Sequence, residues 1–322
     1  MKRLGCLGLI LGLGAIAGLF GVMQSWGGKG PLPVNKSVVV PAGASLTRAA
    51  DELEKAGAIG SASRFVLFAK LFGSSDPIRA GEYPLPAGIS QADLLKLMQG
   101  GKTLQRFVPV PEGLPSVLVQ EALMRAPELT GKVGVPAEGS VLPDSYSYQR
   151  GETRAAVLGR MQRAMDRYLA EAWKRRKPGI AVSTPREALI LASIVEKETA
   201  VEAERRTVAA VYSNRLRQGM RLQADPTIIY PLTKGRPLGR RILRSEVNAV
   251  NGYNTYAMTG LPEGPIANPG RKSIDAVLDP APSPALYFVA DGKGGHVFAN
   301  TLAEHNANVA KWYAIRKARG EM

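Results

Sequence analysis

Two closely spaced glutamates are the first residues of this sequence that could do chemistry. Residues 193–200 read SIVEKETA, which places Glu196 and Glu198 on either side of Lys197 in an otherwise small and apolar segment. Burial of a carboxyl group raises its pKa, and such a group can act as a general acid near neutral pH. Most glutamates on helices are instead solvated charges, and this alternative stays open for both residues.

Helical geometry does not choose between the two glutamates. At about 100° per residue, Glu196 shares a face with small residues such as Ala192. Glu198 points to nearly the opposite side of the helix, among Leu191 and Ile194. One face suits the floor of a substrate cleft and the other suits an apolar pocket, so each residue remains a candidate.

The helix that carries both glutamates has a clear start signal. Ser183 or Thr184 can act as N-cap, Pro185 suits the first helical position, and Glu187 follows in the first turn. An amphipathic helix is also expected before it, over residues 154–175.

Cysteine and histidine chemistry have little support in this chain. Cys6 is the only cysteine, which excludes a disulfide within the chain and a thiolate metal site. The two histidines, His296 and His305, show no H-E-x-x-H spacing, so no metal or cofactor is expected. The chemistry must therefore use carboxylates, hydroxyls and amides. His296 could donate to a substrate or be an ordinary structural histidine.

Polar and aromatic side chains gather in three later stretches. Residues 208–230 form a helix followed by a polar extended segment, and residues 252–270 are rich in Gly, Pro, Asn and Tyr. Residues 285–313 are typical of a hairpin followed by a helix. Amide and aromatic side chains suit a sugar or peptide ligand, although the first stretch also fits a polar helix end followed by a loop.

Three segments nearer the N-terminus share a strand–turn–helix pattern. They cover residues 38–57, 83–101 and 107–124, and each contains a Pro-Ala-Gly or Pro-Glu-Gly turn. Small units of this kind resemble the LysM modules that bind glycan chains of cell walls. The alternative is a small packing domain without a ligand of its own.

The first 30 residues predict a membrane anchor. No charged residue lies between Arg3 and Lys29, and the apolar run is long enough to cross a bilayer with Trp26 at its outer interface. A cleaved signal peptide is the rival interpretation, because residues 15–17 read AIA. With a retained anchor, everything beyond residue 30 lies outside the cytoplasm.

The excess of basic over acidic residues favours an anionic partner. Lys and Arg number 42 against 27 Asp and Glu, which gives a formal net charge of +15. The longest basic run is KRRK at residues 174–177, and neither zinc-finger spacing nor an RNP-like aromatic signature is present. Nucleic acid is therefore not expected as a partner, and an anionic cell-wall polymer fits better.

Five motifs, in order, make the chain resemble the endolytic murein transglycosylases of the YceG-like family. They are EGSVLPDSY, LASIVEKET, NRLRQGMRLQADPT, YNTYAMTGLPEGPIANPG and DGKGGHVFANTLAEHN, within residues 138–306. The resemblance implies an α+β fold with an N-terminal transmembrane helix over residues 1–30, a LysM-like subdomain over 31–106 and a mixed α+β catalytic domain over 107–322. Ser145 and Glu263 depart from the pattern without removing a required group.

The resemblance also implies an activity and a site. Such enzymes cleave the β-1,4 bond between N-acetylmuramic acid and N-acetylglucosamine inside nascent strands, leave a 1,6-anhydro end and limit strand length. The first glutamate of the I-V-E-K-E-T motif, Glu196, is implied to be catalytic, so Glu196→Gln is expected to abolish cleavage. Glu198 is expected to have a structural or supporting role. The implied substrate-binding positions are Asn214, Gln223, Asp225, Tyr253, Asn254, Tyr256, His296, Glu304 and Asn306.

Lytic cleavage explains how one carboxylate can suffice. The C6 hydroxyl of the substrate replaces water as the nucleophile, so a single group can serve as acid and then as base. A hydrolytic muramidase with Asp225 as second carboxylate and a non-catalytic glycan-binding scaffold remain alternatives. The implied partners are peptidoglycan strands, the inner membrane and a peptidoglycan synthase, with a single-pass protein whose catalytic domain is periplasmic.

Overall fold

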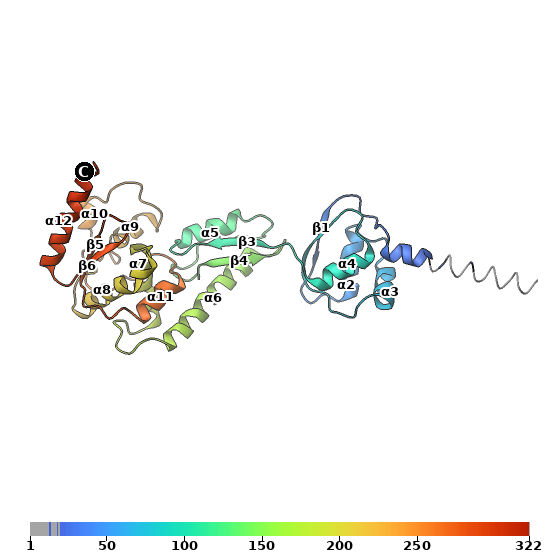
Figure 1. The fold of residues 1–322 in the computed structure, drawn as a ribbon, viewed down its shortest axis with the longest axis horizontal. Coiled ribbons are helices and arrows are strands. Elements are labelled where there is room, and N and C mark those ends of the chain that lie inside the picture. The colour runs from blue at the N-terminus through green and yellow to red at the C-terminus, as the bar shows by residue number, and fades with distance from the viewer. Residues whose placement is uncertain (1–12, 14–17, 19, 322) are drawn as a thin grey trace, which may run out of the picture. The chain divides into compact units, whose positions relative to one another are not determined.

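The protein folds as two units with separate hydrophobic cores (Figure 1). The computed structural model describes residues 13, 18 and 20–321. The first unit contains the described residues up to Arg106 together with Ser147–Gly151, and the second contains Phe107–Tyr146 and the described residues from Glu152 onward. The domain boundaries expected from the sequence and the functions expected of the domains stay predictions.

The first unit has the order strand, helix, helix, strand, helix. Its elements are β1 (Lys36–Val40), α2 (Leu46–Lys55), α3 (Ala62–Phe72), β2 (Gly81–Leu85) and α4 (Gln91–Gly100). The two strands pair antiparallel, with Val38 opposite Tyr83. Alternate residues of β1 and one face of each helix are apolar, and these side chains close the core. The helices α2, α3 and α4 begin at serine N-caps, which satisfy free backbone N–H groups.

The second unit is mostly helical, with two small two-stranded sheets. Its elements are β3 (Arg106–Val110), whose first residue belongs to the first unit, α5 (Ser116–Arg125), β4 (Asp144–Tyr148), whose last two residues belong to the first unit, α6 (Arg154–Lys174), α7 (Pro185–Glu198), η1 (Glu202–Glu204), α8 (Arg205–Arg217), α9 (Pro226–Thr233), α10 (Arg244–Val247), α11 (Arg271–Leu278), β5 (Tyr287–Ala290), β6 (His296–Ala299) and α12 (Leu302–Ala318). The sheets are β3–β4 and the antiparallel hairpin β5–β6.

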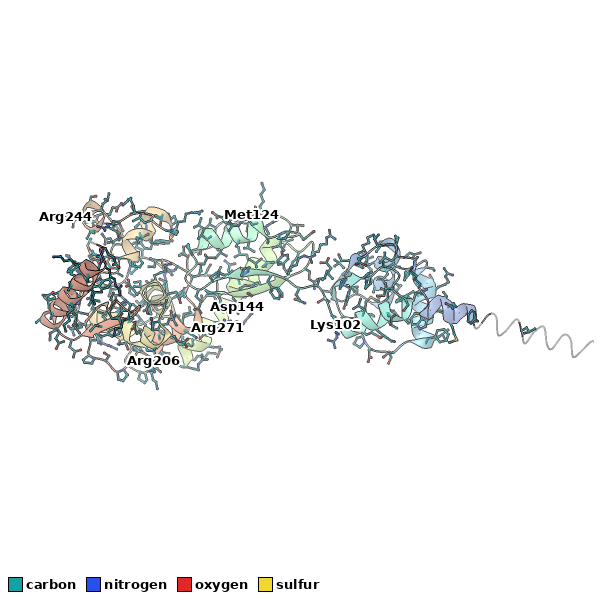
Figure 2. The ribbon with its side chains drawn as sticks, turned by 45° about the horizontal axis from the view of Figure 1, so that its top comes forward. Lys102, Met124, Asp144, Arg206, Arg244 and Arg271 are labelled. Carbon is teal, nitrogen blue, oxygen red and sulfur yellow. The ribbon has the colours of Figure 1, made fainter. Side chains whose placement is uncertain are left out.

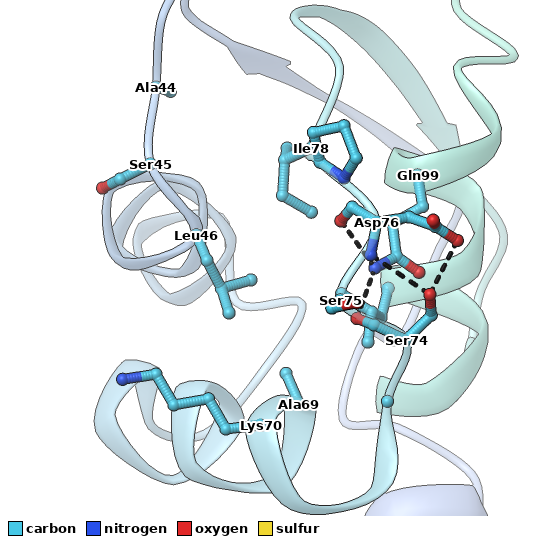
Figure 3. A pocket seen from close by; sticks show the side chains of 13 residues that line it. Ala44, Ser45, Leu46, Ala69, Lys70, Ser74, Ser75, Asp76, Ile78 and Gln99 are labelled. Atoms are coloured by element: carbon cyan, nitrogen blue, oxygen red, sulfur yellow. Dashed lines mark hydrogen bonds between the residues drawn. The ribbon is translucent and has the colours of Figure 1, made fainter.

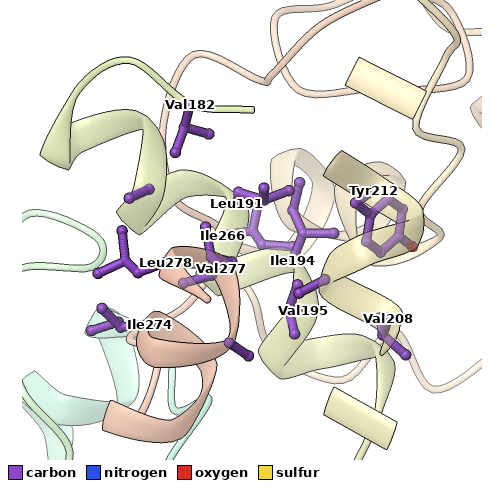
Figure 4. Close-up of a cluster of buried hydrophobic side chains, with 14 of the residues drawn as sticks. Val182, Leu191, Ile194, Val195, Val208, Tyr212, Ile266, Ile274, Val277 and Leu278 are labelled. Atoms are coloured by element: carbon purple, nitrogen blue, oxygen red, sulfur yellow. The ribbon is translucent and has the colours of Figure 1, made fainter. Parts of the chain in front are cut away.

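The helix α7 lies at the centre of the second unit and packs against α6, α8, α9 and α11. Thr184 and Glu187 form a capping box, and Pro185 occupies the first turn, as the sequence predicts. Figure 4 shows Leu191 and Ile194 of α7 among side chains from α8 and α11. A helix that is apolar nearly all round belongs in a core, so the C-terminal end of α7 is held firmly.

An ion pair links β4 to α11 near this core. Arg271 at the start of α11 donates to Asp144 at the start of β4 over 3.0 Å, and both are labelled in Figure 2. The guanidinium group of Arg271 lowers the pKa of Asp144. Because both side chains are largely exposed, the pair adds at most about 1 kcal/mol to stability.

The mixed α+β character is confirmed, and the transmembrane part of the fold prediction is corrected. Among the described residues, no helix is both long enough and apolar enough to cross a membrane. Most of the predicted span, at residues 1–12, 14–17 and 19, lies outside the described residues. Trp26 packs against Phe65 of α3, with ring centroids 5.9 Å apart, so its indole belongs to the first unit.

The three predicted strand–turn–helix segments are present, and they are divided between the two units. The first two supply β1–α2 and β2–α4 of the first unit, whereas the third supplies β3 and α5 and lies almost wholly in the second unit. The helix α3 between the first two was not predicted. Its sequence, ASRFVLFAKLF, is apolar on several sides, which obscures the helical period.

Candidate active site

A polar cavity of about 380 Å³ lies beside the end of α7 in the second unit, and we call it the Glu198 pocket. Its walls are supplied by four elements, α7, α8, β5 and α12, and by the loops that follow α8 and α10. The lining residues are Glu198, Tyr212, Arg215, Leu222, Gln223, Asp225, Tyr256, Phe288 and His305. Such a gathering of titratable groups from distant segments is typical of an active site.

Glu198 is the last residue of α7 and points into this pocket. The residue is half-buried, but its Oε1 atom is buried and has no hydrogen-bond partner among the described residues. Burial raises the pKa of Glu198 to about 7, and the nearby charge of Asp225 also raises it. The Tyr212 hydroxyl donates to the carboxylate and Arg215 lies nearby, and both oppose that rise. Near neutral pH, a large fraction of Glu198 is therefore protonated.

Three of the residues expected to bind substrate meet in the same pocket: Gln223, Asp225 and Tyr256. The Tyr256 hydroxyl donates to Asp225 Oδ1 over 2.6 Å. Burial and this bond raise the pKa of Tyr256. Gln223 has φ of 55°, and its backbone N–H donates to Thr255 over 3.2 Å. The loop is thus bent so that exposed polar side chains border the pocket.

Arg215 and His305 line the pocket and are among the residues that were not chosen from the sequence as site residues. Arg215 is buried, and its guanidinium donates to the carbonyls of Leu286 and Leu222, each over 2.7 Å. His305 stacks on Tyr287 with ring centroids 5.2 Å apart. Burial, and to a lesser extent Arg215, lowers the pKa of His305, so its imidazole is neutral near pH 7.

Arg215 and His305 both lie inside the motifs that carry the family resemblance, and this position was the one sequence signal that could have identified them. Arg215 follows Asn214 in NRLRQG, and His305 stands between Glu304 and Asn306 in AEHN. The choice among neighbours depends on which way each side chain faces, and that becomes visible only in the fold.

Glu196 occupies a different environment, outside the Glu198 pocket. Its Oε2 accepts a hydrogen bond from the backbone N–H of Gly270 over 2.9 Å, at the N-cap of α11. Gly113 has φ of 71°, and a Cβ atom there would lie 3.4 Å from Glu196 Cγ. The carboxylate therefore ties the end of α7 to the start of α11, and the Glu196 side chain lies close to the backbone at Gly113.

Three other predicted site residues are engaged in holding the fold. Asn214 Nδ2 donates to the carbonyls of Ser283 and Ala285 over 2.8 and 3.0 Å. Asn254 is fully buried, and its Nδ2 donates to three backbone carbonyls between residues 246 and 249. Tyr253 packs on Tyr230 with ring centroids 4.8 Å apart.

The remaining predicted residues lie around the hairpin and α12. His296 Nδ1 is 2.8 Å from Glu204 Oε2, and its backbone N–H donates to the same carboxylate over 2.9 Å. Glu304 accepts from the N–H groups of Asn300 and Thr301 and thereby caps its own helix. Asn306 is exposed on α12. None of these three is among the residues that line the Glu198 pocket.

Comparison with known proteins gives a consistent result. The sequence model of the YceG-like family matches residues 38–311. The chain is 28% identical over 316 aligned positions to the endolytic murein transglycosylase of Bacillus subtilis strain 168, covering 88% of this chain and 86% of that protein. It is 29% identical over 356 positions to the endolytic murein transglycosylase of Streptococcus pneumoniae serotype 2 strain D39, covering 94% of this chain and 64% of that protein.

A solved structure is also similar. The crystal structure of a YceG-like protein from Listeria monocytogenes superposes with a TM-score of 0.53 at 28% sequence identity. The match covers 85% of this chain and 98% of that one.

Proposed function

The chain belongs to the YceG-like family, and on that premise we propose that it is an endolytic murein transglycosylase, as its relatives are named. It cleaves the β-1,4 bond between N-acetylmuramic acid and N-acetylglucosamine within a strand and leaves a 1,6-anhydro end. The observation that carries the mechanism is Glu198, an acid with a pKa of about 7 in a polar cavity.

The reaction needs one group that first gives a proton and then takes one back. Protonated Glu198 donates its proton to the glycosidic oxygen as the bond from C1 to that oxygen breaks, and positive charge develops on the muramoyl ring. The C6 hydroxyl of the same ring then bonds to C1, and its proton passes to the Glu198 carboxylate. Because the nucleophile is part of the substrate, its approach requires no second molecule.

The geometry favours Glu198 over Glu196 as this acid. Glu198 has a raised pKa and lines the pocket, whereas Glu196 lies outside the pocket and its carboxylate accepts a hydrogen bond from the backbone N–H of Gly270. We therefore assign proton transfer to Glu198 and a positioning role to Glu196, in place of the role that the sequence resemblance implies for Glu196.

Gln223, Asp225 and Tyr256 are the substrate contacts that this proposal retains. Asp225 is exposed, so it can accept from sugar hydroxyls while Tyr256 holds its other side. A second carboxylate near the acid also supports the alternative reaction, hydrolysis by a muramidase, in which Asp225 would activate water.

The products distinguish these reactions directly. Uncrosslinked glycan strands are digested with the full chain, and the fragments are weighed by mass spectrometry. We expect anhydro ends, which are lighter by one water than reducing ends. Reducing ends would indicate a muramidase, and unchanged strands that still bind the protein would indicate a scaffold.

For the first unit we propose binding of the same glycan, in line with its LysM-like pattern. A cavity of about 480 Å³ lies among the start of α2, the end of α3, α4 and residues 73–78 (Figure 3). Gln99 of α4 donates to the carbonyls of Ser74 and Asp76, over 2.8 and 2.9 Å, and so fixes one wall.

Loss of this wall should weaken glycan binding. Gln99→Ala in the full chain should reduce co-sedimentation with insoluble peptidoglycan, and Gln105→Ala, an exposed glutamine outside the cavity, serves as control. Equal binding by the two variants would favour a packing role for this unit.

Murein is assembled outside the cytoplasmic membrane, so the proposed activity places the enzyme there, in the periplasm. Release of a growing strand would place it beside a murein synthase. The location and the neighbouring synthase are both proposed from the activity, and both would be rejected if the activity were absent.

A further inference from the structure

A second cavity of the second unit has no role in the reaction described above. It has a volume of about 530 Å³, and we call it the apolar groove. Its lining residues are Glu112, Gly113, Leu114, Pro115, Leu118, Lys197, Pro226, Ile229, Tyr230, Gly235, Arg236, Pro237, Leu238 and Ile266. Most of these side chains are aliphatic, in contrast to the polar lining of the Glu198 pocket.

The apolar groove and the Glu198 pocket share two chain segments. Lys197 lines the groove and Glu198 lines the pocket, and the same holds for Pro226 and Asp225. Neighbouring Cα atoms are about 3.8 Å apart, which is less than the length of one sugar ring. The two cavities therefore border the same two stretches of chain, at the end of α7 and at the start of α9.

The rim of the apolar groove carries charge. Lys197 is exposed, and its Nζ lies 3.4 Å from the carbonyl of Gly113, a long contact that leaves the ammonium group available. Arg236 is an exposed cation that already pairs with Glu121, and Glu112 contributes an exposed carboxylate. Aliphatic walls with such a rim suit a short peptide with small alkyl side chains and carboxylates better than a sugar.

One wall of the apolar groove is held in place by a buried network. Glu138 accepts from the backbone N–H and the hydroxyl of Ser116, over 2.9 and 3.0 Å. Asn268 Nδ2 donates to Leu114 over 2.8 Å and to Ser116 over 3.1 Å. This network fixes the turn into α5, so little ordering is needed when a ligand binds.

We propose that the apolar groove binds the peptide stem of the muramoyl residue whose glycosidic bond is broken, with Lys197 pairing with a stem carboxylate. In murein the stem is attached to muramic acid, the same sugar that presents C1 to Glu198. The stem thus begins within one ring of the reacting bond. The inference rests on the proposed function and adds that the enzyme recognises the peptide stem as well as the glycan.

The test compares strands that differ only in their stems. Uncrosslinked strands are used intact or after enzymatic removal of the peptides, and kcat/KM is measured with the full chain. We expect at least about tenfold preference for intact strands, since one charge pair and a few buried methyl groups have this effect. Lys197→Gln and Leu118→Asn should each lower the preference by about threefold or more.

Lys132→Gln is the matched control, because Lys132 is an exposed lysine of the same unit that lines neither cavity. It should keep the wild-type preference. Melting temperatures of all variants check that they fold. Equal rates on both strands, with no effect of Lys197→Gln, would overturn the inference while leaving the proposed function intact.

A binding measurement separates the two claims if neither strand is cleaved. That result would contradict the proposed function. Muramoyl peptide and N-acetylmuramic acid alone are then titrated into the full chain. Tighter binding of the peptide form, weakened by Lys197→Gln, would support the groove, and equal binding would reject it.

Discussion

At the scale of single residues, the end of α7 shows how two similar glutamates acquire different chemistry. Glu196 accepts a hydrogen bond from the backbone N–H of Gly270, whereas Glu198 faces a cavity and its Oε1 atom is buried. The difference comes from the segments that surround the helix end, since the helix itself presents both side chains. Periodicity from the sequence could show that they point apart, but not which side would become a pocket.

The raised pKa of Glu198 predicts the pH dependence of the reaction. The proton-donating form predominates below the pKa of about 7 and is lost above it. The value of kcat should therefore fall about tenfold per pH unit above neutrality. Initial rates between pH 5 and 9 test this, and a rate that is constant up to pH 9 would contradict the assignment of the acid.

The same shift predicts a change in stability. A carboxyl whose pKa is raised on folding stabilises the native state below its ordinary pKa of 4.5, and this contribution is lost as the pH rises through about 7. Glutamine carries no charge at either pH. Glu198→Gln should thus be more stable than wild type at pH 8, by roughly 1–3 kcal/mol, and nearly equal at pH 4. Denaturant unfolding at the two pH values measures it, and a destabilised variant at pH 8 would argue against a buried carboxyl.

At the scale of elements, the loop between α10 and α11 owes its shape to one amide. Asn254 donates to the carbonyls of Glu246, Val247 and Ala249 and accepts from the N–H of Tyr256. It therefore sets the position of Tyr256, which borders the Glu198 pocket.

Removal of that amide should be costly. Asn254→Ala removes three hydrogen bonds to backbone carbonyls and the volume of a fully buried side chain, and it should lower the free energy of unfolding by about 2–4 kcal/mol. Asn306→Ala, at an exposed position of α12, should change it by less than about 0.5 kcal/mol. Thermal unfolding of both variants makes the comparison, and equal effects would contradict the role of Asn254 in holding the loop.

Element by element, the sequence predicts what depends on local signals. The start of α7 follows from Thr184, Pro185 and Glu187, which bond within one turn. The roles of Asn214 and Asn254 could not be predicted, because an amide that binds a sugar and one that binds a carbonyl look alike in sequence. Only the packing of distant segments decides between them.

At the scale of the whole molecule, a net charge of +15 favours association with an anionic polymer. Salt screens such attraction, so KM for murein strands should rise at least about threefold between 50 and 300 mM salt, while kcat changes little. Steady-state kinetics at several salt concentrations provide the test. A salt-independent KM would assign recognition to local contacts alone.

The central claim is that Glu198 supplies the proton, and one digest tests it. Wild type, Glu198→Gln and Glu196→Gln are incubated with uncrosslinked strands, and the anhydro ends are counted by mass spectrometry. We predict that Glu198→Gln loses activity by about 10²–10⁴-fold, while Glu196→Gln stays within roughly tenfold of wild type. Retained cleavage by folded Glu198→Gln together with an inactive, folded Glu196→Gln would contradict the account.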